Sequence, residues 1–106
     1  MSGKDEFLVV YCTAPPEESD ALARTLVQER LAACVNIAPV RSCYIWEGKL
    51  SLDPEALLII KTTRGSFEPL KKRILELHSY SLPEIIALPV AEGHQPYLYW
   101  LARSVG

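Results

Sequence analysis

The side chains best suited to bind a metal are three cysteines and two histidines, spread along the 106-residue sequence. Cys12 lies in an apolar segment, and a cysteine thiolate is a soft ligand that favours Cu(I). His78 adds an imidazole suited to Cu(II) or Zn²⁺, although such sites usually have three or four ligands. Cys34, Cys43 and His94 form no Cys-x-x-Cys or His-x-x-x-His spacing. Cys12 and His78 are therefore candidate metal ligands, but the residues alone favour the alternatives of a buried packing residue and a helix C-terminal residue.

A second group combines charged and aromatic side chains near the ends of expected strands. A cleft between subunits with this lining would hold a small anion or another metabolite. The alternative is a set of interface ion pairs with aromatic packing, which needs no ligand. The residues in this group are Tyr44, Trp46, Glu47, Lys49, Lys61, Tyr80, Glu84 and Trp100.

Catalytic chemistry is not favoured. The sequence contains no G-x-S-x-G, P-loop or H-E-x-x-H motif. A Cys12–His78 dyad would need a third, orienting group and an oxyanion site, and no motif indicates either. We expect a protein that is not an enzyme.

Charge and composition exclude several partners. The formal net charge is −2 and the basic residues are scattered, which does not fit binding to nucleic acid or to an anionic membrane. The RNP1 pattern of RNA-binding domains is also absent. No segment approaches the roughly 20 apolar residues of a membrane-spanning helix. Three cysteines without a disulfide framework fit a reducing compartment, so we expect one domain, residues 1–106, in the cytoplasm.

The elements that would position these residues alternate between strand and helix patterns. The expected order is β-α-β-β-α-β with a tail helix, which is the α+β, ferredoxin-like arrangement. Strands are predicted over 7–13, 34–46, 49–62 and 84–90, and helices over 17–33, 66–78 and 95–103.

Local signals refine this outline. Glu47-Gly48 predicts a tight hairpin turn in which Gly48 has a positive φ. Ala38-Pro39 predicts a bulge or an edge position, with Asp53-Pro54 roughly opposite it. Ser66 is the expected N-cap of the second helix.

The apolar strands predict an oligomer. Residues 56–60 and 8–10 are apolar at every position, whereas two helices cover only one face of a four-stranded sheet. Another copy of the chain would cover the other face, and cyclic symmetry is the usual arrangement. A dimer meets this argument almost as well as a trimer, and the residues alone do not choose between them.

Several linked motifs resemble the CutA divalent-cation-tolerance family, in its order and spacing and over nearly the whole chain. They are Val9-Val10-Tyr11-Cys12-Thr13-Ala14-Pro15, the segment 29–37, Tyr44-Ile45-Trp46-Glu47-Gly48-Lys49, Lys61-Thr62-Thr63, His78-Ser79-Tyr80, Pro83-Glu84-Ile85 and Tyr97-Leu98-Tyr99-Trp100.

The resemblance implies a ferredoxin-like homotrimer with a cytosolic role in divalent-cation tolerance and in copper binding. Cys12 matches the cysteine of the family's V-V-x-C-T-A-P strand, and His78 matches the second histidine of its H-H-P-Y-x-x-P-E segment. Leu77 and Ser79 stand where that segment has its first histidine and its proline. The resemblance thus implies copper, or another divalent cation, at Cys12 and His78. An alternative that stays open is a trimeric signalling or scaffold module that binds a small molecule or a protein, with incidental metal binding.

Overall fold

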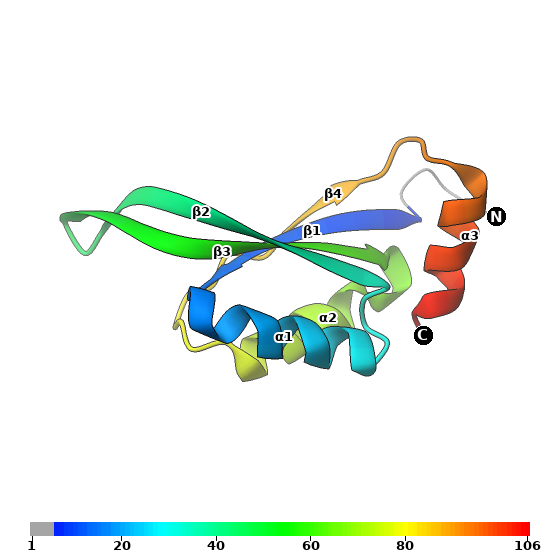
Figure 1. The fold of residues 1–106 in the computed structure, drawn as a ribbon, viewed down its shortest axis with the longest axis horizontal. Helices are drawn as coiled ribbons and strands as arrows, with labels where there is room; N and C mark the ends of the chain where they lie inside the picture. The colour runs from blue at the N-terminus through cyan, green and yellow to red at the C-terminus, as the bar shows by residue number, and fades with distance from the viewer. Residues whose placement is uncertain (1–5) are drawn as a thin grey trace.

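A computed structural model describes residues 6–106, which form four strands and three helices (Figure 1). Their order confirms the predicted β-α-β-β-α-β pattern with a tail helix. The elements are β1 (Phe7–Ala14), α1 (Pro16–Gln28), β2 (Cys34–Trp46), β3 (Lys49–Thr63), α2 (Arg64–Leu77), β4 (Ile86–Pro89) and α3 (Gln95–Ser104).

The strands form one antiparallel sheet in the order β2-β3-β1-β4. Helices α1 and α2 lie against one face, and the β2–β3 hairpin extends beyond them (Figure 1). Alternate residues of β1 are buried beneath the helices, as the pleat of a strand requires. We call the face without α1 and α2 the open face.

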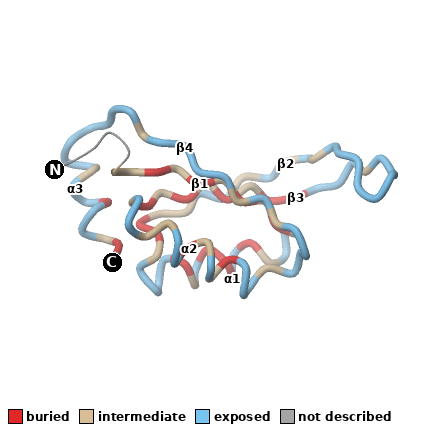
Figure 2. Tube along the Cα trace, turned by 180° about the vertical axis from the view of Figure 1, so that it is seen from behind, coloured by how far each residue is buried: buried red, intermediate tan, exposed pale blue. Residues whose placement is uncertain are grey.

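The core lies between the helices and the covered face (Figure 2). Its fully buried side chains include Leu58 and Ile60 from β3, Leu26 from α1, and Leu70 and Ile74 from α2. A smaller cluster joins Leu101 and Val105 to Ala33 and Phe7, and it holds α3 against the end of the sheet. This docking is what stabilises a helix of only 10 residues.

Helix α1 ends earlier than the predicted residue 33. Arg30 has a φ of 60°, and the N–H of Leu31 donates to the carbonyl oxygen of Leu26 at 3.0 Å. The N–H of Arg30 donates to Val27, which completes a Schellman motif with arginine where glycine is usual. The Arg30 guanidinium also donates to the carbonyl oxygen of Arg103 at 2.8 Å, which ties this turn to the end of α3.

The hairpin is regular along its whole length. Pairing is continuous from Cys34 opposite Lys61 to Trp46 opposite Lys49, so the predicted bulge is wrong and the predicted edge position of β2 is right. Pro39 pairs with Ala56, two residues from Pro54. Glu47 and Gly48 have φ values of 51° and 80°, which confirms the tight turn.

Two other predicted boundaries are wrong. Helix α2 begins at Arg64 with Thr63 as its N-cap, so Ser66 lies inside the helix. Strand β4 is limited to Ile86–Pro89, since within the predicted range 84–90 only these four residues form ladder pairs with β1. Glu84 precedes the ladder.

Candidate functional site

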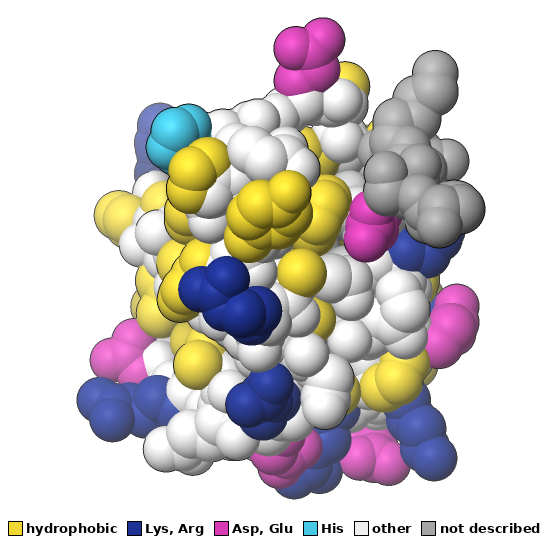
Figure 3. Space-filling view, turned by 90° about the vertical axis from the view of Figure 1, so that its right-hand side faces the viewer, with side chains coloured by type: hydrophobic (Ala, Val, Ile, Leu, Met, Phe, Trp, Pro, Cys, Tyr) yellow, Lys and Arg dark blue, Asp and Glu magenta, His cyan; other side chains and the backbone are white. Residues whose placement is uncertain are grey.

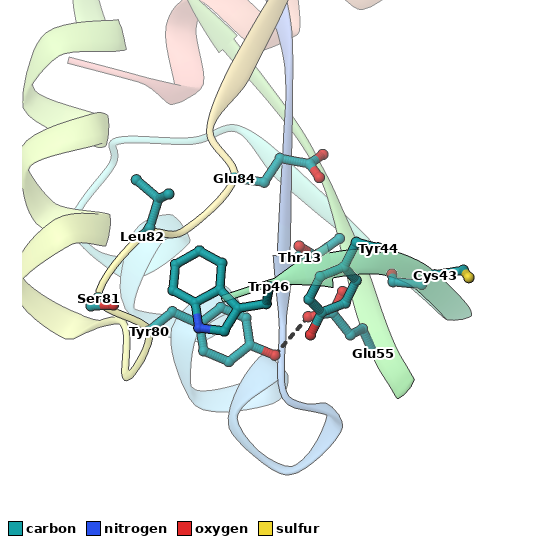
Figure 4. Close-up of a pocket in the computed structure, with 10 residues that line it drawn as sticks. Thr13, Cys43, Tyr44, Trp46, Glu55, Tyr80, Ser81, Leu82 and Glu84 are labelled. Atoms are coloured by element: carbon teal, nitrogen blue, oxygen red, sulfur yellow. Dashed lines mark hydrogen bonds between the residues drawn. The ribbon is translucent and has the colours of Figure 1, made fainter. Parts of the chain in front are cut away.

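A pocket lined by carboxylate, aromatic and hydroxyl side chains lies where the hairpin extends beyond the rest of the protein (Figure 4). Its volume is about 630 Å³. Residues of β1, β2, β3 and the connection between α2 and β4 line it. They are Thr13, Ser42, Cys43, Tyr44, Trp46, Glu55, Tyr80, Ser81, Leu82 and Glu84.

Strand register brings most of these side chains together. Even-numbered residues of β2 and odd-numbered residues of β3 share the open face, so Tyr44, Trp46 and Glu55 lie on the same side. The connection after α2 then places Tyr80 over that side, and its hydroxyl donates to Glu55 Oε2 at 2.6 Å (Figure 4). The pocket is therefore built by the hairpin and closed by the connection.

Two tyrosines bind carboxylates here. Burial, followed by the hydrogen bond to Glu55, raises the pKa of the Tyr80 phenol well above its usual range. The Tyr44 hydroxyl donates to Asp53 Oδ2 at 3.1 Å, and this bond is the main reason that the pKa of Tyr44 is raised. Both phenols therefore stay protonated and act as hydrogen-bond donors.

Cys12 lies next to the pocket wall but faces the core. It is fully buried, and its Sγ contacts the Thr13 carbonyl oxygen at 3.7 Å. Burial, with smaller contributions from the charges of Glu84 and Glu55, raises the pKa of the thiol to about 12. At neutral pH the side chain is a thiol, whereas copper binds the thiolate.

His78 positions the connection that closes the pocket. Its Nδ1 accepts a hydrogen bond from the Tyr80 backbone N–H at 3.1 Å, so the ring proton is on Nε2. Nε2 then donates to the Thr13 carbonyl oxygen at 2.8 Å. The rings of His78 and Tyr80 are also in contact, with centroids 4.7 Å apart. Both ring nitrogens thus have protein partners.

These contacts test how well copper fits the predicted ligands. Cys12 is a buried thiol, and neither nitrogen of His78 presents a free lone pair. Within residues 6–106, no group of three or more His, Cys, Asp and Glu side chains is placed to hold a metal ion. In this arrangement the Cys12–His78 pair does not fit a copper site.

The structure divides the eight predicted cleft residues into two sets. Tyr44, Trp46, Tyr80 and Glu84 line the pocket. Lys61 instead donates a hydrogen bond to Asn36 at the far end of the hairpin, and the ring of Trp100 contacts that of Tyr97 in α3. Glu47 and Lys49 lie at the hairpin turn, outside the pocket of this chain.

Glu55 is the main pocket residue that the sequence analysis missed. It is 6 % exposed, although it is a charged residue beside an apolar run. The turn at Glu47-Gly48 fixes the hairpin register, and that register places Glu55 on the face of Tyr44 and Trp46. Once the turn is identified, the sequence therefore predicts that Glu55 shares a face with Tyr44 and Trp46.

The strand order, with two helices on one face of the sheet, defines a ferredoxin-like α+β domain. Comparison with known proteins shows which one. A family described as "CutA1 divalent ion tolerance protein" matches residues 8–104, and the chain belongs to this family.

Relatives agree with this assignment over most of the chain. "Divalent-cation tolerance protein CutA" of Thermus thermophilus is 51 % identical over 100 residues, covering 92 % of this chain and 97 % of the relative. "Protein CutA, chloroplastic" of Arabidopsis thaliana is 50 % identical over 99 residues; this covers 92 % of this chain and 54 % of that longer one. The solved structure of "PII-like protein CutA" from Nostoc has a TM-score of 0.90 at 35 % identity, covering 93 % of this chain and 97 % of that one. No helix among the described residues is long and apolar enough to span a membrane.

Proposed function

We propose that this protein acts in divalent-cation tolerance as a homotrimer, and that its ligand site is the pocket beside Glu55, at a cleft between subunits. The observation that supports this most directly is the exposed apolar surface of the hairpin. Ile45 and Leu50 face each other across the ladder and are 71 % and 74 % exposed. Contiguous exposed apolar surface usually marks a protein interface.

Two further surfaces support assembly. On the open face, Ile86 and Leu88 of β4 are exposed, and Leu57 and Ile59 of β3, on the other side of β1, are half-buried. At the other end of the molecule, hydrophobic side chains gather around α3 next to Lys and Arg side chains (Figure 3). Tyr97 and Trp100 are among the exposed residues of that helix. A trimer would cover these surfaces, with Glu47, Lys49, Lys61 and Trp100 contributing to the cleft from neighbouring chains.

Copper binding at Cys12 and His78 is the second candidate. It is supported by the family's link with divalent ions and by the names of the relatives. Binding at these residues requires that Cys12 loses its proton and that His78 releases Thr13 or Tyr80. Titration of Cu(I) and Cu(II) into wild type, Cys12→Ser and His78→Ala tests it. Saturable binding at one site per chain that either substitution removes would support this candidate.

The proposed function also includes a cellular location and a non-enzymatic role. We infer a cytoplasmic, non-enzymatic protein, because the three cysteines are free and no catalytic motif is present. The chloroplastic name of the Arabidopsis relative describes that protein, whose chain is longer.

Light scattering with size-exclusion chromatography tests the assembly. The expected mass is three times the 11.9 kDa of the chain. Leu50→Lys places a charge on the exposed hairpin and should lower that mass, whereas Leu75→Lys on the exposed side of α2 should leave it unchanged. A monomeric wild type, or equal effects of the two substitutions, would contradict the proposed trimer.

A further inference from the structure

The buried carboxylate of Glu55 has no cation beside it within one chain. Glu55 is 6 % exposed, and the hydroxyl of Tyr80 donates to its Oε2 at 2.6 Å. A hydrogen bond from a neutral phenol does not cancel the charge of the carboxylate. Burying a charge is costly unless an opposite charge lies next to it. The pocket of a single chain is therefore incomplete, and a second chain can supply the missing charge.

Within residues 6–106, no basic side chain compensates for Glu55. The residues that line the pocket include no Lys, Arg or His. Lys49 and Lys61 share the face of Glu55 on β3, but each is six residues away, about 20 Å along the strand. Lys61 already donates a hydrogen bond at the far end of the hairpin. The ion pairs of α2 use Arg73 and Lys71.

Lys49 has the opposite deficiency at the tip of the hairpin. It is exposed, it directly follows the turn at Glu47-Gly48, and it forms no ion pair among the described residues. The next residue, Leu50, is 74 % exposed and belongs to the apolar tip that the proposed trimer buries against a neighbouring chain. A lysine that is buried with this tip needs a carboxylate, for the same reason that Glu55 needs a cation.

The shape of the chain suits a contact between this tip and the pocket of another copy. The tip extends far beyond the helices (Figure 1), whereas the pocket lies where the hairpin begins to extend (Figure 4). Because tip and pocket are different surfaces, their contact is head-to-tail, and a closed ring of such contacts has one tip and one pocket at every interface.

The rest of the pocket lining also suits an ammonium group. Tyr44 and Trp46 line the pocket together with Glu55, and the faces of aromatic rings attract cations. The cavity of about 630 Å³ is larger than one lysine side chain, so space for a ligand remains beside it.

We propose that the neighbouring chain's Lys49 enters this pocket and pairs with Glu55, so that a second copy of the protein completes each site. The proposal deepens the function proposed above and rests on its assembly, because it names the residue that the neighbouring chain contributes. Arg41, the other exposed basic residue of the hairpin, lies opposite Pro54, away from the apolar tip, and serves as a comparison.

Dissociation of the full-length trimer in urea, followed by light scattering, tests the pair. Lys49→Gln and Glu55→Gln should each raise the dissociation constant at least about tenfold, because the remaining charge is then buried without a partner. The variant with both substitutions should dissociate no more easily than the weaker of the two single variants, because it leaves no charge unpaired. Arg41→Gln and Lys72→Gln, which change exposed basic residues away from the tip, should have little effect.

Mixing two variants distinguishes a pair between chains from a pair within one chain. The Glu55→Gln chain keeps Lys49, and the Lys49→Gln chain keeps Glu55, so a mixed ring restores the pair at one of its interfaces. We expect the mixture to resist urea better than either variant alone. A pair within one chain would gain nothing from mixing.

Three results would overturn the proposal: additive effects of the two substitutions, no gain on mixing, or an effect of Arg41→Gln as large as that of Lys49→Gln. Mass is measured in the same samples without urea. A trimeric wild type whose dissociation does not depend on Lys49 contradicts only the pair, whereas a monomeric wild type contradicts the proposed assembly and the pair with it.

Discussion

On the covered side of the sheet, Leu58 and Ile60 are fully buried, whereas Leu57 and Ile59 alternate with them in the same strand and are only half-buried. The covered side also has the ion pairs of α1 and α2, whereas on the open side the buried Glu55 has no basic partner among residues 6–106. The two faces of the strand have similar hydrophobicity, but only one of them is covered by α1 and α2. Hydrophobic pattern alone therefore identifies a strand as buried, while the helices decide which side is buried within one chain.

The reactivity of Cys12 gives the largest expected difference. The pKa of its thiol rises from 9.0 to about 12 on folding, so the thiolate fraction at pH 8 falls roughly a thousandfold. Alkylation measured by mass spectrometry should be slower by at least this factor than in the urea-unfolded chain. Because the folded pKa is the higher one, the stability from this thiol is complete below pH 9 and is lost between pH 9 and about 12. Equal labelling of folded and unfolded protein would show that the covered side is open to reagent.

Two adjacent leucines test the covering directly. Leu58→Ala should cost about 2–5 kcal/mol in the free energy of unfolding, because it creates a cavity beneath the helices. In the Leu50→Lys background, where the mass is expected to fall to that of a monomer, Leu57→Ala should cost less than half as much, since Leu57 is only half-buried within one chain. Urea denaturation of both substitutions in that background measures the difference. Equal costs there would show that the open face of a single chain is packed as tightly as the covered face.

Two tyrosine–carboxylate pairs compare a buried acceptor with an exposed one. Tyr80→Phe removes the donor to the buried Glu55 and should lower the free energy of unfolding by about 1 kcal/mol. This is at the low end for a buried acceptor, because Tyr80 itself is partly exposed to solvent. Tyr44→Phe removes the donor to the exposed Asp53 and should have a much smaller effect. Thermal unfolding of the two variants measures the difference. The reverse order would show that Glu55 is not effectively buried.

The smallest effect is expected for the bidentate pair between Arg73 and Glu29, whose two N···O distances are 2.9 Å. Its hydrogen bonds lower the pKa of Glu29 below the usual 4.5. A lowered pKa means that the stabilisation is present above pH 4.5 and is lost as the pH falls through the folded value. Glu29→Gln should therefore lower Tm slightly at pH 7 and not in strong acid, with Glu92→Gln as the control. A Tm difference that does not depend on pH would contradict this assignment.

Elements with local signals were predictable from the sequence. Glu47-Gly48 predicts the turn and, with it, the register that places Tyr44, Trp46 and Glu55 on one face. The end of α1 was not predictable in the same way. Arg30 adopts the left-handed conformation without a glycine signal, and the buried Ala33 continues the helical spacing by coincidence.

Parts of the site depend on contacts that spacing does not reveal. Tyr80 reaches Glu55 only because the connection after α2 returns to the hairpin. Lys61 lies in the same strand as Glu55, but it pairs with Cys34, at the opposite end of the hairpin from Trp46. Proximity in sequence misleads along a 15-residue strand, because its ends lie about 46 Å apart at the usual rise of about 3.3 Å per residue.

The β2–β3 hairpin is fully formed within a single chain. Every residue of the 13-residue β2 pairs with β3, and the two positive-φ turn residues complete the ladder. Because the hairpin is already ordered, binding of a partner to its hydrophobic tip does not require a loop to fold, and little conformational entropy is lost on association. Docking of such an arm resembles the meeting of two rigid bodies, in which shape complementarity rather than folding on contact limits the rate of assembly.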